Sequence, residues 1–363
     1  MGTTQENRSS LLTQTDLHAN IRLLSMSLLV IPIFIAHQGC PHRCIFCDQH
    51  TITGHSAQED LPVSPVVVRE TIKQWLGHPR KEGRNEVQVA FYGGSFTGLP
   101  LQRQKELLSA AISYIDAGQV NSIRISTRPD YIDADIVAFL QEHSVSIVEL
   151  GIQSLDLNVL EASVRGHSVE QSERAIQLLR ENGFTVGAQL MCGLPGDSTN
   201  KLMATARRVA ALGPDFVRIY PTLVIKGSGL EKLYLEDAYK PLSLSKAIAL
   251  TCRVKNIFDQ HHIRVVRMGL QPSRDLEKKV VVGPYHPAFG ELVISRALFK
   301  QARKLLRQMM RNGKKCLSIA AADESAFRGP NNVSMKRLTG LGLLNGVELV
   351  FDEDQARNSV IVY

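Results

Sequence analysis

Short apolar segments alternate with amphipathic segments along most of this 363-residue chain. Six of the apolar segments are short and rich in β-branched residues, as expected for strands that are buried on both faces. The amphipathic segments between them have the length and spacing of helices. This alternation predicts a parallel α/β fold with helices outside the sheet. The predicted strands cover residues 28–35, 87–92, 122–126, 146–151, 184–191 and 216–220.

Start and stop signals support the predicted helices between these strands. Pro65 stands at the first position of a helix that runs to residue 76, a position where the missing N–H costs nothing. Asp133 is placed to cap a helix that ends near residue 142, and Asn182-Gly183 follows another as a stop. The predicted helices cover residues 65–76, 100–115, 133–142, 169–181 and 200–212.

Polar or glycine-bearing motifs follow nearly every predicted strand at its carboxyl end. In a barrel these ends meet at one mouth, where such enzymes keep their active sites. A doubly wound sheet would instead concentrate function at one switch point. The spread of motifs over six strands therefore favours an open (β/α)6 barrel, a partial TIM barrel. The motifs lie at residues 38–40, 93–94, 128–130, 153–154, 193–196 and 221–222.

Three cysteines follow the first predicted strand with the spacing C-x3-C-x2-C. Cys40, Cys44 and Cys47 can all face one point if the backbone forms a loop. Three thiolates on an iron–sulfur cube leave the fourth iron without a protein ligand. A structural zinc site would close its shell with a fourth ligand, and His37, His42 or His50 could supply it. Both kinds of site are open on spacing alone.

The other three cysteines are scattered singly and form no disulfide framework. Cys192, Cys252 and Cys316 are expected to be small buried apolar residues. All six cysteines fit a reducing compartment, and we expect a cytoplasmic protein. The apolar residues 21–36 are interrupted and too short to span a bilayer. No small-residue cleavage site follows them, so no membrane partner is expected.

The cysteine spacing, with Phe46 before the last cysteine, resembles the signature of the radical S-adenosylmethionine superfamily. The resemblance implies a 4Fe-4S cluster on Cys40, Cys44 and Cys47. It also implies that S-adenosylmethionine chelates the open iron and is cleaved to a 5′-deoxyadenosyl radical, which abstracts hydrogen from a substrate. An electron donor such as flavodoxin or ferredoxin would supply the electron, and Phe46 would lie near the adenine.

Four further residues are expected to hold the cofactor under this resemblance. Gly93 and Gly94 resemble the glycine motif that binds the amino group of S-adenosylmethionine, although a tight turn is an alternative. Gln153 would contact its ribose or methionine part, or else be a satisfied polar residue at the barrel mouth. Arg165 would clamp the carboxylate with a bidentate pair, or else be a surface arginine.

Several segments together resemble the radical half of the Elongator catalytic subunit, which modifies transfer RNA at the wobble uridine. This resemblance implies RNA as substrate. The gap between the first two cysteines is shorter here than in that family, and Ser126 stands where Glu is expected. The chain ends at Tyr363, so we expect no acetyltransferase domain and do not transfer the carboxymethylation reaction. The matching segments are residues 92–96, 127–130, 149–154, 165–169, 193–195 and 220–227.

A basic helix is predicted at residues 291–310, with its apolar side toward the core. Its cations form either a solvated face or a surface that follows phosphates. The formal charge of +7 and pI near 9.1 permit an anionic partner without requiring one. The cations are Lys300, Arg303, Lys304, Arg307, Arg311, Lys314 and Lys315, and the apolar side comprises Leu298, Ala302, Leu305 and Met309.

Three parts of the chain are predicted. Residues 1–25 form a disordered extension, and residues 26–284 form the barrel with a following helix (242–261) and strand (263–268). Residues 285–363 form a small α+β domain. The function predicted is a radical enzyme acting on an unidentified substrate, with transfer RNA as the first candidate. The alternatives are a radical enzyme acting on a small metabolite and a non-catalytic zinc/RNA-binding module.

Overall fold

The computed structural model describes residues 28–35, 39–40, 44–48, 63–78, 86–312 and 316–363, and the side chains of 309–312 are excepted. The predicted extension 1–25 lies outside the described residues. So do His37, His42 and His50, the residues considered as a fourth zinc ligand.

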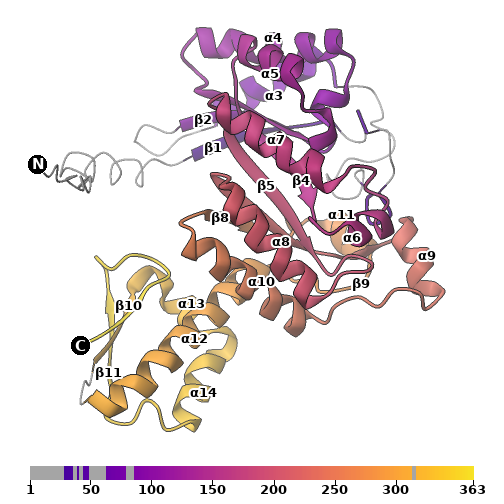
Figure 1. Ribbon diagram of the computed structural model, residues 1–363. Coiled ribbons are helices and arrows are strands. Elements are labelled where there is room, and N and C mark those ends of the chain that lie inside the picture. The colour runs from indigo at the N-terminus through magenta and orange to yellow at the C-terminus, as the bar shows by residue number, and fades with distance from the viewer. Residues whose placement is uncertain (1–27, 36–38, 41–43, 49–62, 79–85, 313–315) are drawn as a thin grey trace, which may run out of the picture.

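Seven parallel strands form one sheet, and their order in the sheet follows their order in the chain (Figure 1). Each of the six predicted strands is present, with its ends shifted by a residue or two. The strand predicted to follow the barrel pairs with the sixth one and so becomes the seventh member of the same sheet. The strands are β1 (Leu28–Phe34), β2 (Glu86–Tyr92), β3 (Ser122–Thr127), β4 (Val145–Gln153), β5 (Thr185–Cys192), β6 (Phe216–Pro221) and β8 (Arg264–Met268).

Helices connect these strands and pack on one face of the sheet. Right-handed crossovers between sequential parallel strands place every helix on the same face. The order never reverses, so the sheet is an open barrel and not a doubly wound sheet. The predicted partial TIM barrel is therefore confirmed. The main helices are α3 (Pro65–Leu76), α4 (Leu101–Asp116), α5 (Ala134–Glu142), α7 (Val169–Glu181), α8 (Thr199–Leu212) and α10 (Leu244–Gln260).

The predicted caps explain where several helices begin. The Ser64 side chain accepts a hydrogen bond from the N–H of Val67 ahead of α3, and Asp133 caps α5 in the same way. Ser168 and Gln171 form a reciprocal capping box at the start of α7. Apolar residues of these helices bury the outer face of the sheet, including Ile31, Phe91, Ile125, Leu150 and Leu190.

Several short elements of the barrel were not predicted, because each is too brief to show a period. They are α6 (Leu157–Ala162), α9 (Gly229–Leu235), α11 (Arg274–Lys279), the paired strands β7 (Val224–Ile225) and β9 (Val280–Val282), and the 3-10 helices η2 (Phe96–Gly98) and η3 (Pro129–Tyr131).

The C-terminal elements form a three-stranded sheet packed on the basic helix. The helix and the α+β character of residues 285–363 were predicted, whereas the central strand was missed. Leu298 and Ala302 of the predicted apolar face are buried in this core, whereas Leu306 is buried there in place of Leu305, which is half-buried. The side chain of Met309 lies outside the described residues. The elements are α12 (Phe289–Asn312), β10 (Cys316–Ala320), η4 (Ala321–Asp323), α13 (Glu324–Arg328), η5 (Pro330–Asn332), α14 (Val333–Gly340), β11 (Glu348–Asp352) and β12 (Val360–Val362).

The helix α12 belongs to two cores. Phe289 and Val293 in its first half pack against α10, whereas Leu298 and Leu306 pack in the C-terminal core. The predicted boundary at residue 285 therefore stays a prediction. No helix within the described ranges is both long and apolar enough to cross a membrane.

Candidate active site

The cysteine loop lies at the carboxyl end of β1 and presses against the loop that follows β2. Gly39 has φ +72°, and a β-carbon there would lie 2.1 Å from the carbonyl oxygen of Ser95. A β-carbon on Gly98 would likewise lie 2.1 Å from the carbonyl oxygen of Gly39. No side chain fits between two backbones at this distance, so glycine is required at both positions.

The opposite side of the loop is held by two segments far along the chain. The Ile45 N–H donates to the carbonyl of Ser163 over 3.2 Å, just after α6. The Leu230 N–H, in the first turn of α9, donates to the carbonyl of Ile45 over 2.7 Å. Gly229 lets α9 approach, because a β-carbon there would lie 2.8 Å from the Ile45 side chain. The short unpredicted helices α6 and α9 therefore position the cysteines.

Phe46 lies beneath the loop in a small apolar cluster. Its buried ring packs with Val159, Leu194, Val224 and Leu230. Val224 belongs to the segment 220–227, so the structure gives that segment a physical role in supporting the loop. The contact predicted between Phe46 and an adenine stays a prediction.

The three thiols of the loop are near enough to interact electrostatically. Burial raises the pKa of Cys47, and the charges of Cys44 and Cys40 raise it further, while Arg165 lowers it. Within the described ranges, no three His, Cys, Asp or Glu side chains meet as ligands of one metal ion. Thiolates of an iron–sulfur cube bind separate irons, so they stand farther apart than ligands of one zinc. The donor set fits a cluster, whose positive irons would offset the repulsion among the thiolates.

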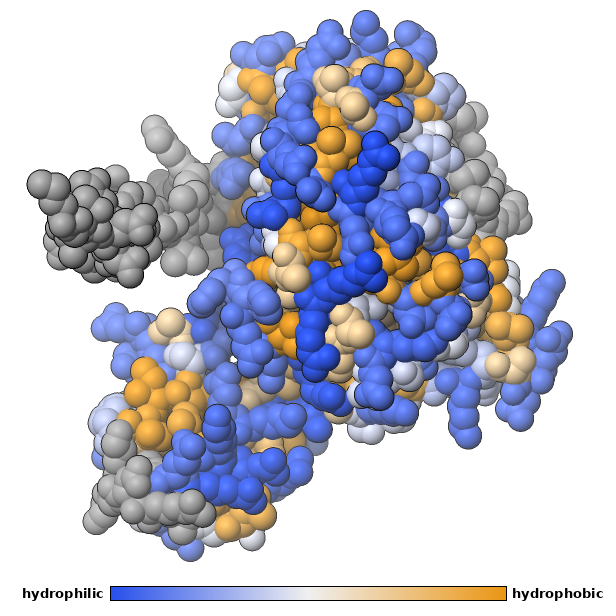
Figure 2. Space-filling view, in the orientation of Figure 1, coloured by the Kyte–Doolittle hydropathy of each residue, from blue (hydrophilic) through white to orange (hydrophobic). Residues whose placement is uncertain are grey.

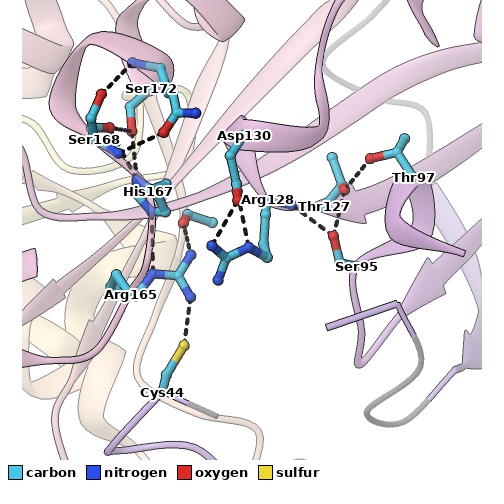
Figure 3. A network of polar contacts seen from close by, with 12 residues as sticks. Cys44, Ser95, Thr97, Thr127, Arg128, Asp130, Arg165, His167, Ser168 and Ser172 are labelled. Atoms are coloured by element: carbon cyan, nitrogen blue, oxygen red, sulfur yellow. Dashed lines mark hydrogen bonds and ion pairs between the residues drawn. The ribbon is translucent and has the colours of Figure 1, made fainter. Parts of the chain in front are cut away.

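Arg165 lies beside the cysteines, and its guanidinium is directed at protein groups (Figure 3). Its Nη1 donates to Cys44 Sγ over 3.0 Å, and its Nη2 donates to the carbonyl of Gly151. Its Nε donates to Nε2 of His167 over 3.3 Å. The guanidinium that was predicted to clamp a cofactor carboxylate is thus engaged with a cysteine, a strand end and a histidine.

His167 fixes Arg165 from the side away from the cysteines. Since its Nε2 accepts from Arg165, its Nδ1 carries the proton and faces the Ser168 carbonyl at 3.2 Å and Ser172 Oγ at 3.3 Å. Burial lowers the pKa of His167 to about 4, and the neighbouring Arg165 contributes. The imidazole is therefore neutral at physiological pH and can accept from the guanidinium.

Arg128 was not predicted as a site residue, yet it is buried at the end of β3. Its Nε and Nη2 each donate to Asp130 over 2.9 Å, which fixes the plane of the guanidinium. Its Nη1 is buried and has no hydrogen-bond partner among the described residues. Buried polar atoms are rarely left unpaired, so Nη1 is suited to an anionic ligand. The motif 127–130 at a strand end was the available signal.

Two predicted site residues lie at strand ends at the same mouth: Gly93 directly follows β2, and Gln153 is the last residue of β4. Gly93 has φ +86°, and Gln153 has φ +68°, which is uncommon for a residue with a side chain. Gln153 is buried, and its Oε1 accepts from Gln189 Nε2 over 3.4 Å. Backbone strain of the kind implied by the positive φ of Gln153 is found at ligand sites. Gly94 follows Gly93 and is half-buried.

Hydroxyl groups join the loops after β2 and β3. Ser95 Oγ lies 3.0 Å from Thr127 Oγ1 and accepts from the Arg128 N–H over 3.3 Å, while Thr97 Oγ1 lies 2.6 Å from Thr127 Oγ1 (Figure 3). The loop that carries the two glycines is thereby tied to Arg128.

Two family models match most of the chain. Residues 34–209 match the radical SAM superfamily, and residues 214–298 match the radical SAM C-terminal domain. An uncharacterized protein of Methanocaldococcus jannaschii is 33% identical over 230 residues, which cover 61% of this chain and 69% of that protein.

A tRNA uridine(34) acetyltransferase of Methanocaldococcus jannaschii is 28% identical over 303 residues, which cover 73% of this chain and 54% of the relative. The chain thus spans about half the length of that enzyme. The structure of Elp3 from Methanocaldococcus infernus, with residues 1–46 deleted, is 24% identical with a TM-score of 0.56. The match covers 80% of this chain and 64% of that one, and it shows the same fold.

Proposed function

The chain belongs to the radical SAM superfamily, and from that premise we propose that it removes a hydrogen atom from an RNA substrate. It is an enzyme that uses a 4Fe-4S cluster and S-adenosylmethionine. When bound, these groups supply a one-electron cleavage of S-adenosylmethionine that leads to hydrogen abstraction from the substrate. The main observation in support of this active site is the contact between Arg165 and Cys44, which joins the cysteine loop to the mouth of the barrel.

In this proposal Cys40, Cys44 and Cys47 hold the cluster. Arg165 orients Cys44 and donates a hydrogen bond to its sulfur, and His167 keeps the guanidinium in place. Hydrogen bonds to cluster sulfurs are one way in which proteins set the reduction potential. Arg165 is therefore assigned to the cluster first, and its predicted role as a carboxylate clamp is secondary.

Arg128 takes the carboxylate of S-adenosylmethionine in this proposal. Its unpaired Nη1 offers a charged donor, and Asp130 keeps the guanidinium from turning away. Gly93 and Gly94 offer backbone groups to the amino end of the cofactor, Gln153 offers its amide to the ribose or methionine part, and Phe46 lies near the adenine. These residues bind and orient the cofactor and help to exclude water from the reacting atoms.

RNA is the substrate class that the surface supports. A hollow of about 370 Å³ on α12 is lined by Lys300, Arg303, Lys304, Arg307 and Gln308. Four of these five residues are cationic, and hydrophilic side chains cover the exposed side of this helix (Figure 2). Phosphates bind such surfaces with strong salt dependence. The relatives named for tRNA uridine(34) point to transfer RNA as the first RNA to test.

Filter binding of transfer RNA over a salt series tests the substrate class. We expect the double variant Lys304→Gln, Arg307→Gln to bind more weakly and to reduce the salt slope by about 2, one unit per phosphate contact. The control is Arg207→Gln, because Arg207 is exposed on α8 and is not among the residues that line the hollow. If the affinity for transfer RNA does not depend on salt, or if the control weakens binding as much as the double variant does, RNA is excluded as the substrate class. A small metabolite would then be favoured. Cytoplasmic location and a flavodoxin or ferredoxin donor belong to the same proposal.

A further inference from the structure

The two faces of the barrel sheet differ in what they bury. Along β2 to β6, one set of alternating residues is fully buried against the helices, as Phe91, Ile125 and Ile219 are. The intervening residues point to the concave inner face, because side chains alternate along a strand. In most TIM barrels bulky branched side chains fill the interior. Here the inner positions near the carboxyl ends stay half-exposed: Tyr92, Ser126, Gln189, Met191, Arg218 and Tyr220.

A network of charged and polar side chains occupies this inner face. Glu149 from β4 lies between two arginines, with its Oε1 3.4 Å from Arg124 Nη1 and its Oε2 2.7 Å from Arg218 Nε. Tyr92 donates to Glu149 Oε1 over 3.3 Å. Arg218 in turn donates to the hydroxyls of Tyr92 over 3.1 Å and Tyr220 over 3.3 Å. Four strands of the barrel, β2, β3, β4 and β6, contribute to the network.

The network holds more positive than negative charge. Glu149 offers one carboxylate to the two guanidiniums of Arg124 and Arg218, which leaves one positive charge in excess. Tyr92 does not compensate, because burial and Glu149 raise its pKa and keep it a neutral phenol. A partly buried charge without a counter-charge is costly, and an anion bound beside it would remove that cost.

Hydrogen-bond donors on this face are also left over. Of the eight buried side-chain atoms without a hydrogen-bond partner in the described part of the chain, three are donors on the inner face: Ser122 Oγ, Arg124 Nε and Arg218 Nε. A fourth inner-face atom of this group, Gln88 Oε1, is an acceptor. Arg218 Nε is close to Glu149, but its N–H is not aligned for a hydrogen bond. A guanidinium has five N–H groups, and the two tyrosine hydroxyls engage two of them on Arg218.

Arg218 is the more accessible of the two arginines. The side chain of Arg124 is 10% exposed and lies over the Phe216 ring, 5.0 Å from its centroid. Gly187 makes room for that ring, because a β-carbon there would lie 2.4 Å from it. The side chain of Arg218 is 18% exposed. Arg218 also lies over an aromatic ring, that of Tyr92, 5.4 Å from its centroid, but it keeps the larger exposed fraction and is the arginine that a ligand can reach more readily.

The network adjoins the residues assigned to the cofactor. Tyr92 directly precedes Gly93, and Gln189 donates to Gln153. A group bound at Arg218 would therefore lie on the substrate side of the cofactor. We propose that Arg218, supported by Tyr220, binds an oxyanion of the substrate on the inner face of the barrel. This inference rests on the proposed function and adds the chemistry of recognition: a phosphate if the substrate is a nucleotide, and a carboxylate if it is a small metabolite.

Binding of small probes to the reconstituted enzyme with S-adenosylmethionine present tests this inference. The probes are uridine 5′-monophosphate, uridine and citrate. The affinity of each is measured by titration calorimetry at fixed salt. We expect one oxyanion probe to bind saturably, with uridine at least tenfold weaker than its monophosphate if phosphate is the group recognised. Binding of citrate alone would assign the site to a carboxylate. Failure of both anions to bind would overturn the proposal.

Variants with opposite expected effects separate recognition from a structural role. Arg218→Gln should weaken the anion at least tenfold, as the loss of a charge-assisted hydrogen bond does. Glu149→Gln should tighten it several-fold, because it removes the only acid of the network. Arg207→Gln on α8 should change nothing. A purely structural network would lower the melting temperature in both inner-face variants and leave anion affinity unaltered, which would contradict the proposal.

Two further comparisons make the binding experiment decisive. If Glu149→Gln does not fold, Tyr220→Phe replaces it, and we expect it to weaken the anion because the hydroxyl beside Arg218 is lost. If Lys304→Gln and Arg307→Gln abolish binding while Arg218→Gln does not, the anion binds the α12 hollow and the proposal is wrong. Formation of 5′-deoxyadenosine without substrate reports the proposed chemistry separately, so either idea can fail while the other stands.

Discussion

At the scale of single residues, Gly39 shows how the cysteine loop depends on a missing side chain. Its backbone lies against Ser95 and Gly98 at distances that leave no room for a β-carbon. Its φ of +72° adds a second reason for glycine. The contact positions the loop against the segment after β2, so cluster retention should depend on this glycine although it donates nothing to iron.

The variant Gly39→Ala tests this dependence, with Gly118→Ala as its control. Gly118 has a similar φ of +67° and open space around its β-carbon position. Both variants should lose about 1 to 2 kcal/mol from backbone strain. Only Gly39→Ala should also lose iron on reconstitution, measured as iron and sulfide per chain. Equal iron content in the two variants would show that the close approach is unimportant.

Arg128 and Arg165 differ in whether the guanidinium has an N–H group free to bind a ligand. Arg165 is engaged with Cys44, Gly151 and His167, whereas Arg128 has an unpaired Nη1. We expect Arg128→Gln to weaken S-adenosylmethionine binding about tenfold or more with unchanged iron content. Arg165→Gln should instead shift the reduction potential, followed by electron paramagnetic resonance. If Arg128→Gln binds S-adenosylmethionine with unchanged affinity, Arg165 and not Arg128 binds the carboxylate.

His167 makes stability depend on pH. Its pKa is lowered from 6.5 to about 4 in the folded chain, chiefly by burial. Between these values the unfolded chain binds the proton and the folded chain does not, so stability falls as the pH drops through this range. The whole shift corresponds to roughly 3 kcal/mol. Urea unfolding from about pH 7 to about pH 5 should show a steeper loss in the native chain than in His167→Asn, and parallel slopes would contradict the assignment.

At the scale of elements, the barrel was predictable and the supports of its site were not. Strands and long helices show a clear period, and caps such as Asp133 mark their ends. The helices α6 and α9 and the strand β10 have five to seven residues and show no period. The cysteines and glycines could be located from motifs. The partner of Arg165 could not, because folding brings it to Cys44 across 121 positions.

The helix α9 is expected to hold the cysteine loop through Leu230. This side chain is fully buried beneath the loop, in the cluster that includes Phe46. Leu230→Ala should cost about 2 to 5 kcal/mol through the cavity it leaves and should also reduce iron retention. Leu338→Ala makes a comparable cavity in the C-terminal core and should lose stability without losing iron. If the two variants retain iron alike, α9 does not support the loop.

At the scale of the whole molecule, three separate surfaces are assigned to the proposed reaction. The mouth of the barrel carries the cysteines with Arg128 and Arg165, the concave face of the sheet carries the network around Glu149, and α12 carries the basic hollow. The wide separation of these features along the chain explains why the motifs predicted the chemistry better than the substrate. The cysteine loop indicates the chemistry, and in our proposal the inner face and the hollow recognise the substrate.

The most direct test of the chemistry is the yield of 5′-deoxyadenosine from the anaerobically reconstituted chain after reduction with S-adenosylmethionine. We expect four irons per chain, absorption from thiolate-bound iron, and 5′-deoxyadenosine that disappears when Cys40, Cys44 or Cys47 is replaced by alanine. A colourless chain that binds zinc through these cysteines and forms no 5′-deoxyadenosine would contradict the assignment.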